Sequence, residues 1–221
     1  MWKERKACRM NNKNDLVKYS ISERYTKDNI VKDFIFKPQT KEWFLTENQA
    51  RREVEAYLNI VPEAILDALS YEGWSIEITD TNLESRFGFK YEIYGVTDEE
   101  SKTIYVYAYP LAVKYALAHE IGHFVDSYLG NVSKMHDWKR IRDLHEKYPS
   151  NKELDTFYFS DREEDDKEYF ANCFLLYIND KDLLKKANNR AYQVMERICT
   201  NIEHIVELFQ TQKFRSLNSC L

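Results

Sequence analysis

Two histidines and a glutamate stand together in the segment His119-Glu120-Ile121-Gly122-His123. On an α-helix, residues four apart share one face, so His119 and His123 can direct their imidazoles at one metal ion. Glu120 follows the first histidine and projects beside such an ion without having to bind it. The spacing predicts a zinc hydrolase centre, in which two neutral histidines and one further protein ligand leave a position on the metal for water.

The chemistry expected of this centre is hydrolysis of a carbonyl compound. Zinc lowers the pKa of its water to about 7, so that a nearby carboxylate can remove a proton at neutral pH. Glu120 is therefore the predicted general base, which takes that proton and hands it to the leaving amine. The alternative interpretation is a charge-rich helix on which both histidines are merely solvated.

A helix is predicted around this motif, from Pro110 to Gly130. Proline suits the first turn of a helix and glycine suits its end. An apolar stripe at three- and four-residue spacing is expected to face the core, and it consists of Leu117, Ile121, Phe124 and Tyr128.

Composition indicates one globular domain, or a compact domain with an appendage. The chain has 221 residues, of which 43% are hydrophobic, with only five glycines and four prolines. The net charge of -5 argues against a phosphate-binding surface, so nucleic acid is not the expected partner. The four cysteines have no short paired spacing, which excludes a disulfide framework and a cysteine zinc site. They are Cys8, Cys173, Cys199 and Cys220.

Residues 1–46 are expected to form a poorly specified lead-in, and residues 47–215 a single metallopeptidase domain. The expected fold class is α+β, with a small antiparallel sheet packed on the motif helix and a mainly helical C-terminal part. Two helices are predicted from Glu47 onward, separated at Pro62. Alternating apolar residues predict strands at 74–78, 87–93 and 103–107, with a turn over 95–102. An edge strand near the metal could pair with an extended peptide, or the sheet could simply cover the core.

The third ligand is sought on a second informative helix, which begins near Glu168 and is apolar nearly all round. A carboxylate at a buried position is costly unless it is paired or binds a metal, which makes Glu168 the best candidate. Glu163 and Glu164 lie in an acidic run that is more typical of a solvated loop. Asp126 has two interpretations, as a group that orients a ligand histidine or as a helix-surface carboxylate. The remaining histidines, His136, His145 and His204, are expected at the surface.

The motif at 119–123, followed by Glu168-Tyr169-Phe170-Ala171, resembles the zinc peptidase family of the anthrax lethal factor catalytic domain and the secreted clostridial Pro-Pro endopeptidases. The resemblance covers roughly residues 47–210. It implies a zincin-like fold of the gluzincin type, with His119, His123 and Glu168 as zinc ligands and Glu120 as the base. It also implies that Tyr158 donates a hydrogen bond to the oxyanion. Asn172 stands where that family has a second glutamate.

The resemblance further implies one catalytic Zn²⁺ and a protein or peptide substrate, cut by a secreted or delivered protease of the toxin type. A monomer is the expected state. No apolar run of signal-peptide or membrane-spanning length occurs in the chain, so a cytoplasmic place of action stays open. Two other functions stay open as well: a cytoplasmic regulatory peptidase that cleaves a repressor, and a catalytically silent binding module.

Overall fold

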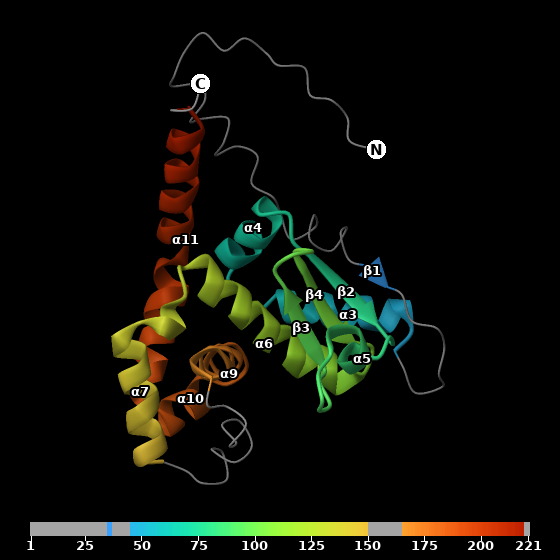
Figure 1. Cartoon of the computed structure of the whole chain (residues 1–221), viewed down its shortest axis with the longest axis horizontal. Helices are drawn as coiled ribbons and strands as arrows, with labels where there is room; N and C mark the ends of the chain where they lie inside the picture. The colour runs from blue at the N-terminus through green and yellow to red at the C-terminus, as the bar shows by residue number, and fades with distance from the viewer. Residues whose placement is uncertain (1–34, 37–44, 150–164, 219–221) are drawn as a thin grey trace.

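The computed structural model describes residues 35–36, 45–149 and 165–218. A mixed sheet and two N-terminal helices are followed by a long central helix and a set of C-terminal helices (Figure 1). In chain order the elements are β1 (Ile35–Phe36), α3 (Glu47–Leu58), α4 (Glu63–Tyr71), β2 (Ser75–Thr79), α5 (Leu83–Phe87), β3 (Gly95–Asp98), β4 (Thr103–Tyr107), α6 (Pro110–Tyr128), η1 (Val132–Lys134), α7 (His136–Lys147), α9 (Asp166–Asn179), α10 (Lys181–Ala187) and α11 (Asn189–Asn218).

The helices α3 and α4 lie where their apolar period predicts them. Thr46 and Gln49 form a reciprocal capping box at the start of α3, which satisfies backbone N–H groups that no earlier turn can bond. Pro62 separates the two helices, as expected. The apolar residues whose spacing predicts these two helices are buried in the core; they are Val54, Leu58, Val61, Ile65, Leu66 and Leu69.

The sheet has the strand order β1-β2-β4-β3 and is mixed. β2 pairs in parallel with both β1 and β4, whereas β3 pairs with β4 in antiparallel register, with Gly95 opposite Val106. The expectation of a purely antiparallel sheet was therefore wrong. The chain passes from β2 through α5 and β3 before it returns in β4, and this crossover makes β2 and β4 run in the same direction.

The strand expected at 87–93 is absent, because α5 ends there and a loop follows. Asn82 accepts a hydrogen bond from the N–H of Ser85 at the start of α5, and Gly88 ends the helix in the left-handed conformation, with φ of 77°. The third strand is instead Gly95–Asp98, which lies within the segment expected to be a turn. The alternating aromatic residues of 87–93 thus belong to an irregular segment rather than to a strand.

Helix α6 is the centre of the molecule. It packs against α9 on one side and against β3 and β4 on the other, and Figure 1 shows it between the sheet and the C-terminal helices. It begins at Pro110 and ends just before Gly130, whose φ is 84°, as predicted. Leu117, Ile121 and Phe124 of its apolar stripe are buried. The predicted α+β class, with this helix between a small sheet and a helical C-terminal part, is confirmed.

The C-terminal helices enclose α9, which is buried from Tyr169 to Tyr177. α10 and α11 both pack against it, and the amphipathic α11 buries Ile198 and Ile202. Over the described residues, no helix is both long and apolar enough to cross a membrane.

Candidate metal centre and its cleft

Helix α6 brings the two histidines of the motif onto one face, as their spacing predicts. The Nε2 atoms of His119 and His123 lie 3.0 Å apart, and the ring planes are nearly perpendicular, at 83°. Both rings are partly exposed, whereas Ile121 between them points into the core. The helix thus presents two ring nitrogens to solvent from a rigid support.

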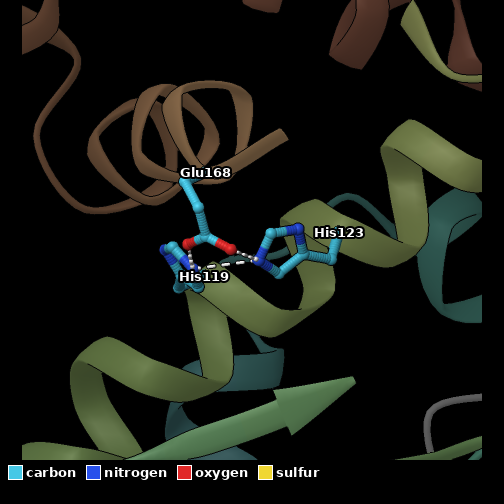
Figure 2. A group of neighbouring side chains, drawn as sticks. All are labelled: His119, His123 and Glu168. Carbon is cyan, nitrogen blue, oxygen red and sulfur yellow. Dashed lines mark hydrogen bonds and ion pairs between the residues drawn. The ribbon is translucent and has the colours of Figure 1, made fainter. Parts of the chain in front are cut away.

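Glu168 reaches the histidines from the first turn of α9, which crosses α6 at short distance (Figure 2). Gly122 permits the approach, because a Cβ atom at this position would lie 2.9 Å from the Cα of Ala171. Asp165 accepts a hydrogen bond from the N–H of Lys167 and so caps α9 directly before the ligand candidate. Asp165 belongs to the acidic run expected to be a loop, and it is in fact part of the support of Glu168.

The three side chains meet in one group. Glu168 Oε2 lies 3.0 Å from His119 Nε2, and Oε1 lies 3.3 Å from His123 Nε2, as the dashed lines in Figure 2 mark. Each residue offers a ligand atom, and these atoms all lie within 4.8 Å of one another. Among the described residues, this is the one group of histidine, cysteine and acidic side chains close enough to hold a metal ion.

Two nitrogens and a carboxylate are a donor set that suits zinc. Ligand bonds of about 2.0–2.1 Å at tetrahedral angles put ligand atoms about 3.3 Å apart, close to the separations found here. Asn172 also fits, because its Oδ1 lies 2.8 Å from His119 Nδ1 and accepts the proton of that nitrogen. The lone pair of a neutral His119 is then on Nε2, toward the other ligands.

The group is an ion pair when no metal is bound. Burial lowers the pKa of His119, but the hydrogen bond to Glu168 and the charge of Glu120 outweigh it and raise this pKa to about 9. Burial would raise the pKa of Glu168, but its hydrogen bonds to His119 and His123 hold it well below the usual range. At neutral pH the imidazole is therefore protonated and the carboxylate is ionised.

Glu120 is buried beside this group and is positioned by strand β3. The hydroxyl of Thr97 lies 2.7 Å from Glu120 Oε2 and 2.9 Å from the carbonyl oxygen of the same residue. Gly95, two residues earlier on the same face of β3, leaves room for the glutamate, because a Cβ there would lie 2.8 Å from its Cγ and Oε1. Neither Gly95 nor Thr97 was found from sequence, since both fall in the segment expected to be a turn.

A cleft of about 660 Å³ opens over these residues. One wall comes from β3 and the loop before it, the second from α6 between Leu111 and Ser127, and the third from α9 between Lys167 and Leu175. His119, His123, Glu120 and Glu168 all lie at its surface, so the candidate ligands and the candidate base are open to one and the same substrate.

No protein-family model matches the sequence, and no curated protein matches it. Among solved structures, the Pro-Pro endopeptidase PPEP-2 from Paenibacillus alvei matches with a TM-score of 0.53 and 21% identity, over 76% of this chain and 99% of that chain. The chain has the zincin fold of that endopeptidase. The expected resemblance is confirmed at the level of the fold and of a His-His-Glu group.

Within the zincin fold, two polar residues take places that the sequence did not predict. Asp126 is buried and accepts hydrogen bonds from the backbone N–H and the hydroxyl of Ser133, at 2.7 and 2.6 Å, so it ties the end of α6 to η1. His145 is buried, against expectation, and its Nδ1 lies 2.9 Å from the hydroxyl of Tyr169. That contact joins α7 to the residue after Glu168. His136 and His204 are exposed, as expected, and Tyr158, Glu163 and Glu164 lie outside the described residues.

Replacing Gly122 by alanine is expected to weaken both the fold and the metal centre. The new methyl group would press on the backbone of Ala171, and overpacking of this kind costs about 1–3 kcal/mol, partly offset by the higher helix propensity of alanine. We expect a net loss of about 1 kcal/mol in urea unfolding and weaker zinc binding, because α9 carries Glu168. Lys114→Ala, on the exposed face of α6, is the control and should change neither quantity. Unchanged zinc affinity in Gly122→Ala would show that the spacing of α6 and α9 does not govern the site.

Metal binding is expected to depend on pH through His119. The imidazole must lose its proton to bind a metal, and with a pKa of about 9 it carries that proton at pH 7 in the metal-free protein. Binding should release about one proton from this residue, and the apparent zinc affinity should fall about tenfold from pH 8 to pH 7. Chelator competition at the two pH values measures the change. Equal affinities would contradict the ion pair.

Proposed function

We propose that this chain is a zinc-dependent endopeptidase that hydrolyses peptide bonds in a protein substrate. The observation that carries the proposal is the convergence of His119, His123 and Glu168 beside Glu120 in one open cleft. The zincin fold shared with a Pro-Pro endopeptidase supports it.

His119, His123 and Glu168 would hold the ion through two imidazole nitrogens and one carboxylate. When bound, zinc lowers the pKa of a coordinated water molecule and polarises a carbonyl group. Asn172 keeps the His119 proton on Nδ1, which leaves Nε2 able to bind. Among these three ligands, Glu168 supplies the one negative charge.

Glu120 is the proposed general base. Its carboxylate lies at the cleft surface, where it can accept the proton of the attacking water and pass it to the nitrogen of the leaving amine. The hydroxyl of Thr97 and the space left by Gly95 hold this carboxylate in one orientation, so the proton acceptor need not be reoriented during the reaction.

Strand β3 is proposed to bind the substrate backbone. It pairs with β4 along one side and lies at the end of the strand order, which leaves its other side as an edge. An extended peptide could add to this edge, where Gly95 and Thr97 already contact Glu120. The sequence allowed two roles for the sheet, as a cover of the core or as a binding edge for a peptide. β2 and β4 cover the core, and β3, which borders the cleft, is the proposed binding edge.

Tyr158 is proposed as the donor to the oxyanion, on the resemblance of the motifs. Tyr158→Phe removes only the hydroxyl, and we expect kcat to fall about a hundredfold to a thousandfold, because one such donor is worth that much. Zinc content should stay unchanged. Steady-state kinetics and elemental analysis check both parts, and an unchanged kcat would leave this role to another group.

The test of the function begins with the wild-type protein. Elemental analysis should find about one zinc per chain, and mass spectrometry should find cleavage products of a mixed peptide library. A chelator should stop the cleavage and added zinc should restore it. Stoichiometric zinc without any cleavage would favour a binding module, and absence of zinc would overturn the metal centre itself.

We propose in addition that the protein acts outside the producing cell, on the same resemblance of the motifs. Fractionation of a producing culture tests this. Recovery of the protein from the medium would support an extracellular substrate, and retention in the cytoplasm would favour a regulatory peptidase.

A further inference from the structure

Three aromatic residues line the cleft beyond the metal centre and remain exposed. Phe89, Tyr91 and Tyr94, which we call the aromatic wall, precede β3 and keep 38%, 54% and 45% of their surface accessible. The rings of Phe89 and Tyr91 pack together, with centroids 5.6 Å apart. Exposed apolar surface gathered in a cleft is typical of a binding site.

The backbone that carries the aromatic wall is held at both ends. The N–H of Phe89 donates to the carbonyl oxygen of Glu84, and the N–H of Ile93 donates to the Oε1 atom of the same residue, at 3.0 and 2.8 Å. At the other end, the carbonyl oxygen of Tyr94 accepts a hydrogen bond from the N–H of Tyr107. A ligand would therefore meet a preformed surface, which reduces the entropy lost on binding.

The charge around the aromatic wall is negative. Glu92 and Glu99 line the cleft, and Lys167 is the one lysine or arginine among the described residues that line it. The hydrogen bond and the charge of Glu92 raise the pKa of Tyr94. Burial raises the pKa of Tyr107, and the charges of Asp80, Glu84 and Glu92 raise it further.

Within the described part of the chain, the cations near this end of the cleft do not line it. Arg86 pairs with Glu77 and lies over the ring of Tyr105, 4.2 Å from its centroid, outside the cleft lining. Lys90 is exposed within the loop but does not line the cleft. A positively charged ligand would therefore meet both aromatic faces and carboxylates.

We propose that the aromatic wall and Glu92 form a subsite for a lysine or arginine side chain of the peptide substrate. The aliphatic stem would cover the rings, and the charged end would lie over an aromatic face within reach of the Glu92 carboxylate. A neutral side chain would cover the rings without compensating the desolvation of Glu92, and an acidic one would be repelled. The inference rests on the proposed peptidase function only in taking the ligand to be a peptide.

Binding of defined probes tests the subsite without any cleavage. The probes are two fluorescein-labelled pools of short peptides, randomised over uncharged residues around one central position. That position is lysine in one pool and Nε-acetyl-lysine in the other, so the pools differ only in the charge. Fluorescence anisotropy with the zinc-loaded Glu120→Gln protein should show about tenfold tighter binding of the lysine pool, and this preference should shrink as salt is raised.

Variants locate the preference on the protein. Glu92→Gln removes the charge and Tyr91→Leu removes an aromatic face, and each should reduce the preference about threefold or more. Glu53→Gln on α3 and Tyr148→Leu after α7 change residues that are also exposed but lie away from the cleft, and both variants should keep the preference. Equal binding of both pools, or a preference that survives both cleft variants, overturns the subsite. A lysine preference without cleavage of any library peptide by the wild type would refute the peptidase and keep the subsite.

Discussion

Replacing Glu168 by alanine is expected to remove zinc from the protein and leave the fold intact. The change deletes the carboxylate of the group and leaves His119 and His123 as the described ligands. Loss of an outer partner of a ligand typically costs 10–100-fold in metal affinity, and loss of the ligand itself should cost more. The fold should survive because Glu168 stands in the first turn of α9, before the buried stretch that begins at Tyr169.

Elemental analysis after dialysis measures this loss, and circular dichroism checks the fold. Glu53→Ala removes an exposed glutamate from α3 and should keep its zinc, which controls for the change in charge. Retained stoichiometric zinc in Glu168→Ala would contradict the ligand assignment. Glu163 and Glu164 of the acidic run, which lie outside the described residues, would then be the next candidates for the third ligand.

The centre on α6 could be predicted because its geometry is local. A four-residue spacing on a helix fixes where His119 and His123 point, whatever the rest of the chain does. Glu168 is 45 residues beyond His123, yet it could be selected because a carboxylate at the start of an apolar helix needs a partner. The crossing that brings these residues together depends on Gly122 and Ala171, and no single helical pattern contains that information.

The sheet could be predicted only in part, because pairing is not local. The five residues of β4 are all β-branched or aromatic, as strands favour, and the strand was found, whereas β3 has four residues, two of them Gly95 and Asp98, and resembles a turn. The register that sets Thr97 against Glu120 follows from pairing with β4 and from packing on α6. The sequence therefore predicts which residue is the base, but it does not predict how the carboxylate of that residue is oriented.

The burial of two polar residues shows the same limit. His145 and Asp126 both lie on amphipathic or mixed helices, where a polar residue is expected at the surface. Each meets a polar partner on another element: the Nδ1 atom of His145 contacts the hydroxyl of Tyr169, and Asp126 accepts a hydrogen bond from the N–H of Ser133. The sequence contains both partners but gives no sign that they meet.

Replacing Glu120 by glutamine is expected to abolish peptide cleavage while zinc stays bound. Glutamine has nearly the shape of glutamate, so it should fit against Gly95 and still accept the hydrogen bond from Thr97. It cannot take a proton from water, and loss of a general base costs about a hundredfold to ten-thousandfold in rate. Cleavage of the mixed library and zinc content, measured on the same preparation, check the two halves of the prediction.

Glu120→Asp separates the chemistry of the base from its position. Aspartate keeps a carboxylate but draws it back by one methylene from the contact with Thr97, so cleavage should fall and still exceed that of Glu120→Gln. Equal activity of Glu120→Gln and wild type would place the base elsewhere. Loss of zinc in Glu120→Gln would make this residue a ligand, whereas full zinc with no cleavage assigns proton transfer to it.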